Sequence, residues 1–487
     1  MADAMRQRGM AYDQVDANDG VGGNWRQGIY EGVHIVSSKR STAYADYPMP
    51  DDYPDFPSAL QMRSYLESYA RDRGLMDSIE FNRRVERASP LADESWIVRF
   101  DDGEERHYKG VVICNGHHWD KRMPSYPGAY TGRLIHSKDY VEPAQLRGKR
   151  VLVLGGGNSG CDIACESARV GASCDWSLRQ GYWFLPKTAF GVPLTDLPIW
   201  GLPVLLQRLV LKSLIKIFIG DYRAYGLPKP KHKLFERHPA FGTDVLNYLR
   251  QGRIKPRPDI ERFAGNKVHF SDGTSGEYDL IVAATGFYNS FPFLPKGLVA
   301  VENDVVHVYG GACPEAVKNL YVIGWAQARN GFGSLITPAT NLYADMIRLQ
   351  DEMELPIGFI LKWRGLKIPT SNLVNPAATR RIIALTHHLL PLLRRRGRIL
   401  AEKNLRAPFD PTPYQSDAPA PQPSAGRAQP QRIRTHARRR KRRPLPSLSA
   451  LSPPSPPLGP LPAPPSVSAR LRSSHTPIPV LMEHCRL

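Results

Sequence analysis

The sequence has little cysteine and no cysteine pattern that signals a metal or redox centre. Among its 487 residues only six are cysteines, and none forms a C-x-x-C pair or a His/Cys cluster with metal-ligand spacing. Cys161 and Cys165 lie one helical turn apart, where small buried thiols are commoner than reactive ones. We therefore expect no metal site and a reducing, cytoplasmic environment.

Long hydrophobic runs are also missing. No apolar segment reaches the ~20 residues of a membrane-spanning helix, and no cleavable signal peptide opens the chain. Leu197 to Ile219 is amphipathic with three cations on one face, and Arg380 to Leu400 is basic at both ends and broken by Pro391. The three cations are Arg208, Lys212 and Lys216. These segments predict peripheral membrane contact and an apolar substrate; a core helix with an exposed basic stripe explains the first equally well.

Acidic residues are too few to balance the basic ones, and the formal net charge is +19. Residues 411–487 hold 12 Lys/Arg against Asp417 and Glu483, so this tail contributes +10 and leaves +9 for the other 410 residues. That remainder is ordinary for a protein that binds anionic cofactors, so we predict no nucleic-acid partner. Because residues 405–487 are rich in Pro, Ala, Ser and Arg, they predict a disordered tail.

The most informative stretch that is present is VLVLGGGNSGCDIA, residues 151–164. An apolar strand precedes three glycines in G-x-G-x-x-G spacing, and a helical pattern follows. Gly155 allows the tight turn, Gly157 lets a pyrophosphate approach the backbone, and Gly160 lets the helix pack close to the strand. The loop residues Asn158 and Ser159 complete a predicted dinucleotide site at the helix N-terminus. A plain glycine-rich turn is the alternative.

The residues after this helix indicate which dinucleotide binds. A second strand near Ser173 to Leu178 leads to Arg179, whose guanidinium could pair with a ribose 2′-phosphate, and Ser177 could add a hydroxyl contact. Asp175 lies nearer the spacing of an NAD-selecting acid, but we place it within the strand. The pattern therefore favours NADPH, with a solvated surface cation as the alternative for Arg179.

The amino-terminal residues resemble the continuation of another dinucleotide fold. A helix end closed by Gly9 is followed by a strand, Tyr12 to Asp16, whose terminal acid is where adenosine ribose hydroxyls would bind; a surface acid is the alternative. Gly22, Gly23 and Trp25 come next. The first strand and its glycine loop are not in the sequence, so we expect either a late start codon or a fragment.

Three later turns follow predicted strands and are further places for a cofactor. The residues assigned to cofactor binding there are Asn115 and Gly116, Thr285 and Gly286, and Gly324. An amphipathic helix is predicted over Ser58 to Asp77, after an irregular Pro- and Asp-rich segment at 34–57.

These residues resemble the flavin-containing monooxygenases, class B flavoproteins. The family fingerprint F-x-G-x-x-x-H-x-x-x-(F/Y) is matched by Tyr130, Gly132, His136 and Tyr140, with Tyr in place of the leading Phe. The GGxW segment, the GNSGCD loop and ATGF at 284–287 also match, and the resemblance covers residues 1–350. Related Baeyer–Villiger enzymes have Trp-Pro where this chain has Tyr140 and Val141, so the match favours oxygenation of a heteroatom.

The resemblance implies an α/β fold with two Rossmann-like dinucleotide-binding domains. An NADPH domain (143–288) would be inserted into an FAD domain whose segments are 1–142 and 289–404. FAD and NADPH would be the cofactors, and one oxygen atom of O2 would reach a small nitrogen, sulfur or apolar organic substrate through a C4a-hydroperoxyflavin. His136 and Tyr140 would brace the domain junction.

The sequence leaves the catalytic residue and the type of reaction open. Many members place an asparagine against the reactive flavin position, but Val36 stands there, so no catalytic residue is assigned. The alternatives are a Baeyer–Villiger ketone oxygenase and an inactive NADP-binding remnant.

Overall fold

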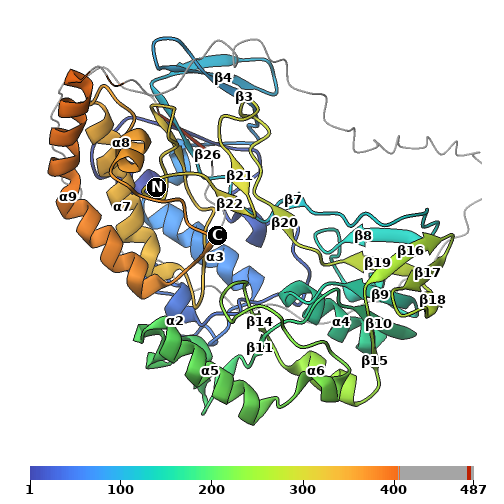
Figure 1. The fold of residues 1–487 in the computed structure, drawn as a ribbon. Coiled ribbons are helices and arrows are strands. Elements are labelled where there is room, and N and C mark those ends of the chain that lie inside the picture. The colour runs from blue at the N-terminus through green and yellow to red at the C-terminus, as the bar shows by residue number, and fades with distance from the viewer. Residues whose placement is uncertain (404, 406–479, 484–487) are drawn as a thin grey trace, which may run out of the picture. The chain divides into compact units, whose positions relative to one another are not determined.

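The computed structural model describes residues 1–403, 405 and 480–483, and Figure 1 shows their arrangement. One five-stranded parallel sheet, here the β9 sheet, is built around the glycine-rich stretch. In spatial order its strands are β15 (Ile254–Arg257), β10 (Ser173–Ser177), β9 (Arg150–Leu154), β19 (Leu280–Ala283) and β8 (Arg133–His136). Strands β9 and β19 are near-continuous runs of buried apolar residues, as expected for central parallel strands covered on both faces. Helices α4 (Asn158–Val170) and α6 (Asp244–Arg250) pack beside the sheet.

A second five-stranded parallel sheet, the β1 sheet, carries the amino-terminal strand. In spatial order it contains β2 (Ile79–Phe81), β1 (Asp13–Asp16), β26 (Val480–Glu483), β6 (Gly110–Ile113) and β23 (Leu320–Val322). The associated apolar core includes residues from α1 (Ala2–Arg6), α3 (Ala59–Asp72) and α7 (Gly333–Gln350). The prediction of two Rossmann-like units in one α/β chain is therefore confirmed.

Strand β26 corrects one prediction. The sequence assigned all of residues 405–487 to a disordered tail, but Val480–Glu483 pair in parallel with both β1 and β6. The physical reason is that β1 and β6 do not pair with each other, so each offers an inner edge of backbone N–H and C=O groups that needs a partner. Most of the tail, residues 406–479 and 484–487, lies outside the described residues.

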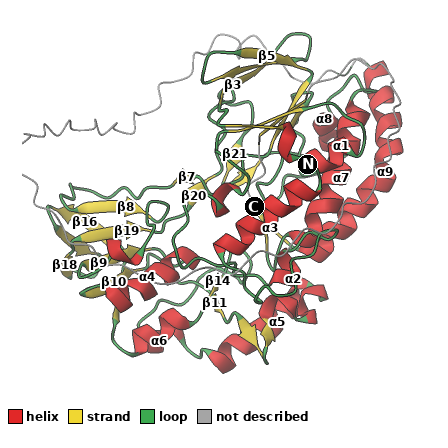
Figure 2. Cartoon of the chain, turned by 180° about the vertical axis from the view of Figure 1, so that it is seen from behind, coloured by secondary structure: helices red, strands yellow, loops and turns green. Residues whose placement is uncertain are grey.

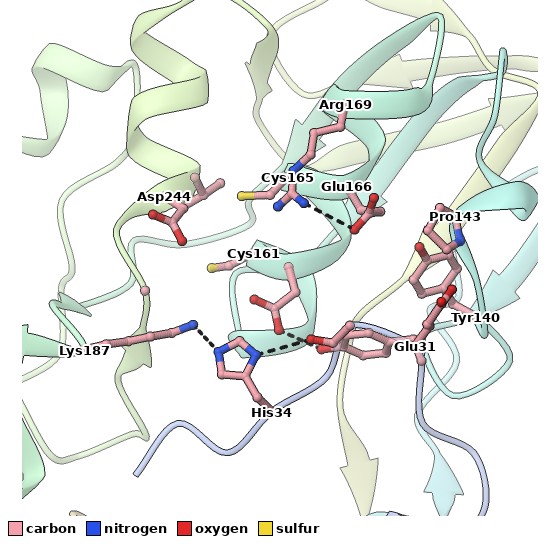
Figure 3. Close-up of a pocket in the computed structure, with 15 residues that line it drawn as sticks. Glu31, His34, Tyr140, Pro143, Cys161, Cys165, Glu166, Arg169, Lys187 and Asp244 are labelled. Atoms are coloured by element: carbon pink, nitrogen blue, oxygen red, sulfur yellow. Dashed lines mark hydrogen bonds and ion pairs between the residues drawn. The ribbon is translucent and has the colours of Figure 1, made fainter. Parts of the chain in front are cut away.

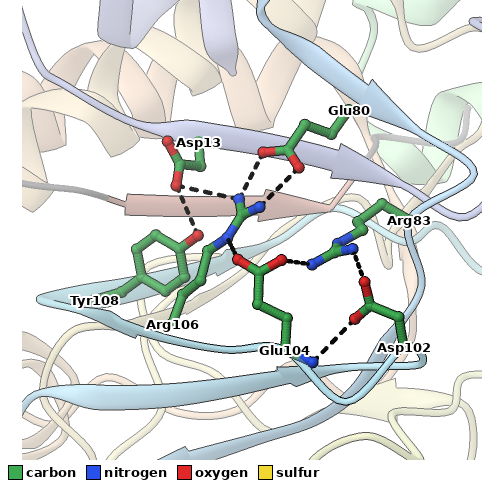
Figure 4. A network of polar contacts seen from close by, with 7 residues as sticks. All are labelled: Asp13, Glu80, Arg83, Asp102, Glu104, Arg106 and Tyr108. Atoms are coloured by element: carbon green, nitrogen blue, oxygen red, sulfur yellow. Dashed lines mark hydrogen bonds and ion pairs between the residues drawn. The ribbon is translucent and has the colours of Figure 1, made fainter.

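A three-stranded antiparallel sheet follows β2 in the chain and is tied to the β1 sheet by charge (Figure 4). Its strands are β3 (Val85–Pro90), β4 (Trp96–Phe100) and β5 (Glu105–Tyr108). Arg106 on β5 contacts Glu80 of β2 at 2.6 Å and Asp13 of β1 at 3.6 Å, and the Tyr108 hydroxyl donates to Asp13 at 2.7 Å. The network holds β5 against the edge of the β1 sheet.

The helices follow local signals in the sequence. Helix α3 begins after Ser58, whose hydroxyl accepts from the Gln61 backbone while the Gln61 side chain accepts from the Ser58 backbone. Figures 1 and 2 both place the long helix α9 (Pro376–Glu402) beside α7. The predicted break at Pro391 is wrong, because α9 continues through it. Packing on α7 and the ion pair between Arg394 and Glu352, at 2.7 Å, offset the one backbone hydrogen bond that proline removes.

The other α-helices of the described chain are the fifteen-residue α5 (Val204–Phe218) and the shorter α2 (Lys39–Thr42) and α8 (Ile357–Trp363). The other strands are β7 (Asp120–Lys121), β11 (Phe184–Leu185), β12 (Thr188–Ala189), β13 (Val192–Pro193), β14 (Ala240–Phe241), β16 (Ile260–Ala264), β17 (Lys267–Phe270), β18 (Ser275–Glu277), β20 (Phe287–Tyr288), β21 (Val301–Glu302), β22 (Val305–Val306), β24 (Gln327–Ala328) and β25 (Leu373–Val374). In the described part of the chain, no helix has both the length and the apolar character needed to cross a bilayer.

Candidate active site

The turn between β9 and α4 has the geometry of a pyrophosphate cradle. Gly155 has φ +102°, and a Cβ there would overlap the Ala284 carbonyl oxygen. A Cβ on Gly160 would overlap the Gly155 carbonyl oxygen, so both positions are closed to side chains. A Cβ built on Gly157, at the N-terminus of the thirteen-residue helix α4, would have no atom within 4 Å. A phosphate can therefore approach the free amides at this point, and the residues fit a dinucleotide.

Two side chains, one from the loop and one from β10, fix the backbone of this loop by hydrogen bonds. The Asn158 side-chain oxygen accepts from the Phe241 backbone at 2.8 Å, and the Trp176 indole donates to the Gly155 carbonyl at 2.8 Å. Ser159 lies in the first turn of α4. Asn158 thus supports the loop from the β14 side, which leaves the backbone amides free for a ligand.

Two polar residues of β10, Asp175 and Ser177, are buried, whereas the arginine beyond the strand is exposed. Asp175 is buried, with Arg257 at 2.6 Å and the Tyr278 hydroxyl at 2.7 Å, so it is a structural acid within the strand as expected. The Ser177 hydroxyl is also buried and donates to the Pro258 carbonyl at 2.7 Å. Arg179 is exposed just beyond the strand. Of the two residues predicted to contact a 2′-phosphate, Arg179 is the one with a solvent-exposed side chain.

On the β1 sheet, Asp16 lies at the carboxyl end of β1 and is buried. Its Oδ1 accepts from the backbone and side-chain nitrogens of Asn18 at 2.8 and 2.7 Å. Gly22 and Gly23 both have positive φ, which turns the chain into the segment that carries Trp25. The Trp25 indole nitrogen is buried and has no hydrogen-bond partner among the described residues. The Asp16 carboxylate and the Gly22–Trp25 turn fit the ribose end of an FAD molecule.

The phosphate end of that site is different. The position between β1 and β6 is filled by β26, and the residues that follow β26 in the sequence are His-Cys-Arg-Leu, without glycine. In the described part of the chain, no G-x-G-x-x-G turn adjoins the β1 sheet. Among the described residues of the β1 sheet, Asp16 and the Gly22–Trp25 segment at the ribose end are therefore the ones that would hold FAD.

Two strands of the β1 sheet end side by side at what we call the junction. It comprises His117 and His118 after β6, residues 324–330 after β23, and residues 235–238 from the chain between α5 and α6. His117 Nδ1 lies 3.0 Å from the Gly324 carbonyl oxygen, and His118 Nε2 lies 3.4 Å from the Gln327 side chain. Asn115 is buried and donates to the Ser290 carbonyl at 3.1 Å, while Gly116 has φ +67°.

Beside the junction, hydrogen bonds and short strands connect the two sheets. His136 Nε2 lies 2.9 Å from the Gly286 carbonyl and Nδ1 accepts from the Lys138 backbone at 3.1 Å, so Nε2 carries the proton. Burial lowers the pKa of His136, which keeps the ring neutral. Thr285 donates to the Arg122 carbonyl, and β20 pairs with β7. Tyr140 lies at the outer side of α4, where it packs on Tyr30 with ring centroids 5.6 Å apart.

Sequence reasoning missed three junction residues, His118, His238 and Arg329. Burial lowers the pKa of His118 and of His238, and the same effect is seen at His117. Arg329 stacks over the Phe235 ring at 4.8 Å. They were missed because they lie on irregular chain between elements; the H-H pair after Gly116 was the one visible signal.

A small pocket of about 140 Å³ lies on the outer side of α4 (Figure 3). Its polar contacts join distant segments: the Lys187 ammonium donates to His34 at 2.6 Å, and the Tyr30 hydroxyl donates to Asp162 at 2.8 Å. Burial raises the pKa of Cys161 and raises that of Cys165 to about 12, so the predicted buried, protonated thiols are confirmed. The volume is below the ~300 Å³ of typical ligand pockets, which favours a bracing role.

Known proteins resemble the chain in sequence. The profile of the Flavin-binding monooxygenase-like family matches residues 16–347. Flavin-containing monooxygenase 3 of Rattus norvegicus is 30% identical over 401 residues, which cover 72% of this chain and 73% of that protein. Flavin-containing monooxygenase 5 of the same organism is 33% identical over 322 residues, which cover 60% of each chain.

Solved structures share the fold. Cyclohexanone monooxygenase from Rhodococcus sp. Phi1, bound to NADP⁺, aligns with a TM-score of 0.60 and 17% identity over 80% of this chain and 95% of its own. S-allyl-L-cysteine S-oxygenase from Allium sativum aligns with a TM-score of 0.56 and 18% identity over 82% of this chain and 90% of its own. The chain therefore belongs to the flavin-binding monooxygenase-like family of monooxygenases that use FAD and NADPH.

Proposed function

We propose that this chain transfers one oxygen atom from O2 to a soft nitrogen or sulfur nucleophile on a small, apolar organic molecule. When bound, NADPH would supply hydride and reduced FAD would supply the chemistry that activates O2. The observation that carries the proposal is the connection between the two sheets: the Thr285 hydroxyl, after β19, donates to the Arg122 carbonyl, and β20 pairs with β7, which follows β6. In this proposal residues 143–288 bind NADPH, and segments 1–142 and 289–404 bind FAD.

The protein's own groups would position ligands and exclude water. The α4 amides at Gly157 would hold the NADPH pyrophosphate, with Arg179 at the 2′-phosphate and Asp16 at the FAD ribose. Asn115, Gly116, Thr285, Gly286 and Gly324 would surround the reacting rings. His117 and His136 are neutral, so they would fix the backbone at Gly324 and Gly286 by hydrogen bonds and carry no charge toward a ligand.

Product analysis tests the proposed reaction. The full chain with FAD and NADPH would be given methyl phenyl sulfide and cyclohexanone under dioxygen labelled with a heavy isotope. We expect labelled sulfoxide and little lactone, because Val141 follows Tyr140 where the ketone oxygenases have Trp-Pro. Lactone as the main product would replace the proposal with the Baeyer–Villiger alternative. A colourless protein that takes up no FAD would identify an inactive remnant.

We also propose that α5 rests on an anionic membrane surface. Leu205 and Leu209 are 73% and 62% exposed, and with Lys212 and Lys216 they form one stripe along the helix. Ile217 and Phe190 are also exposed, at 73% and 77%. An apolar stripe with cations beside it is the pattern of an interfacial helix, and the opposite face is buried through Leu211, Leu214 and Ile215.

Vesicle co-sedimentation tests this contact. Lys212→Glu/Lys216→Glu should abolish binding to vesicles that contain phosphatidylserine, because each cation near such a surface contributes about 1 kcal/mol. The matched control, Arg364→Glu/Lys367→Glu, changes charge equally on an exposed segment away from α5 and should bind normally. Equal sedimentation of both double variants, or binding to purely zwitterionic vesicles only, would rule out the proposed surface.

A further inference from the structure

Arg329 is a cation without a counter-ion at the junction. Its Nε and Nη1 atoms are buried and make no hydrogen bond within the described residues. Its backbone is fixed, since the Arg329 N–H donates to the Val374 carbonyl at 3.2 Å. The side chain is half-buried, and two N–H groups removed from water without partners are unfavourable unless an anion supplies acceptors for them. The position is therefore destabilising unless a ligand supplies negative charge.

The surroundings of Arg329 increase this need for an anion. On one side lies the Phe235 ring, and on another lies Arg208, which is close enough to lower the pKa of Arg329 further. Arg208 donates through Nε to the Leu234 carbonyl at 2.8 Å, which fixes its guanidinium. Neither arginine forms an ion pair with any described Asp or Glu. Two cations held close together without an acid form a positively charged surface.

The rest of the junction supplies polar groups, and its one acid, Glu236, is exposed and accepts from the Lys233 backbone at 2.9 Å. His117 Nε2 is buried without a partner, as is the Asn330 side-chain oxygen, while the His238 ring lies beside the Ala328 backbone. Partial burial lowers the pKa of His117 and of His238. Arg329 is five positions after Gly324, so the two backbone positions lie within about 18 Å of each other.

We propose that Arg329, with Arg208 behind it, receives an anionic group of a small molecule bound at the junction. The inference rests on the proposed function for the identity of that molecule. Two sources present the required charge: a carboxylate on the substrate, or the negative charge that the flavin ring carries when reduced. A planar guanidinium suits either, because it can donate two parallel hydrogen bonds to one anion.

A binding experiment tests the first source. The full chain with FAD and NADP⁺ is titrated by calorimetry with methylthioacetate and with methylthioacetamide, which differ in charge and share the sulfur. The wild type should bind the carboxylate at least tenfold more tightly than the amide. Arg329→Gln should remove this preference, Arg329→Lys should restore part of it, and the exposed control Arg364→Gln should keep it.

A potential measurement tests the second source. If the flavin carries the anion, Arg329→Gln should lower the two-electron reduction potential of bound FAD. The ratio of the affinities for methylthioacetate and methylthioacetamide should then be the same in wild type and variant. A change in probe selectivity or in potential supports the anion site and identifies its ligand. If neither quantity changes between Arg329→Gln and wild type, the proposal is wrong.

A stability measurement needs neither cofactor nor turnover. In the ligand-free chain, Arg329→Met should raise the melting temperature, because an apolar side chain replaces an unpaired, half-buried cation. A lower melting temperature would show that the guanidinium already has a partner. Because neither this measurement nor the calorimetry requires oxygenation, failure of the proposed function would be distinguishable from failure of the anion site.

Discussion

The two parallel sheets hold their dinucleotide-binding strands in different ways. In the β9 sheet the central strand, the glycine turn and α4 are one continuous segment, residues 150–170. In the β1 sheet the equivalent central position is occupied by β26, which is distant in sequence from the other strands. Both sheets are completed as hydrogen-bonded structures, but only the β9 sheet has a phosphate cradle among its described residues.

This difference separates the requirements of folding from those of cofactor binding. Any extended segment that satisfies the inner edges of β1 and β6 completes the sheet, because the ladder is made of backbone groups. A pyrophosphate site needs particular residues, since only glycine fits at Gly155 and Gly160. Among the described residues, the β9 sheet therefore shows both the sheet and the glycine loop, and the β1 sheet shows the sheet.

The largest predicted effect tests the strand that completes the β1 sheet. Leu481→Pro removes a backbone donor from the central strand β26 and should lower the free energy of unfolding by about 3 kcal/mol. Ala463→Pro, elsewhere in the tail and outside the described residues, is the control and should have little effect. Urea unfolding followed by tryptophan fluorescence measures both. Equal stability of the two variants would show that β26 does not hold β1 and β6 together.

The next effect tests the cradle of the β9 sheet. In Gly160→Ala the new Cβ meets the Gly155 carbonyl, so we expect a loss of about 1–3 kcal/mol in stability together with lost NADPH binding. Gly157→Ala has room for its Cβ, so stability should be unchanged while the dissociation constant for NADPH rises about tenfold. Calorimetry and thermal unfolding report the two quantities. Unchanged NADPH affinity in both variants would place the dinucleotide elsewhere.

Coenzyme choice is expected to depend on Arg179. Arg179→Gln removes the exposed cation after β10, and the affinity for NADPH should fall about tenfold while that for NADH stays constant. Arg262→Gln, an exposed arginine on β16, is the matched control. An equal loss for both coenzymes would mean that Arg179 does not contact the 2′-phosphate.

The smallest effect concerns how α1 is attached to α7 beside the β1 sheet. Arg8 binds Asp345 through two hydrogen bonds of 2.5 and 2.9 Å, and this contact lowers the pKa of Asp345. The pair should stabilise the fold by about 1 kcal/mol above pH ~4, the ordinary Asp range, and this contribution should be lost as pH falls through the lowered pKa. Unfolding of wild type and Arg8→Gln at pH 6 and pH 3 measures it. A stability difference that grows toward pH 3 would contradict the assignment.

Much of this architecture could be predicted from the sequence because it depends on local patterns. The β9 turn and the Asp16 strand follow from short motifs, and the helix expected over Ser58 to Asp77 follows from its apolar periodicity, although α3 ends earlier, at Asp72. The flavin and nicotinamide cofactors and the monooxygenase family follow from the resemblance, and the family profile confirms the family. The roles of the individual cofactor residues stay predictions.

What could not be predicted depends on contacts between distant segments. Strand β26 pairs with residues more than 350 positions away, and the continuity of α9 through Pro391 depends on its packing against α7. The junction is assembled from three stretches of irregular chain, so neither periodicity nor motif spacing places Arg329 beside Phe235. A sequence pattern reports the neighbours along the chain, whereas these features depend on neighbours in space.

The most direct test of the central claim is anaerobic mixing of the FAD-loaded chain with NADPH while the flavin absorbance is followed. If the two dinucleotide sites face each other, the yellow colour of oxidised FAD is lost rapidly with NADPH, and Gly157→Ala slows this loss. A flavin that stays oxidised in the presence of NADPH, yet is bleached by dithionite, would contradict the account.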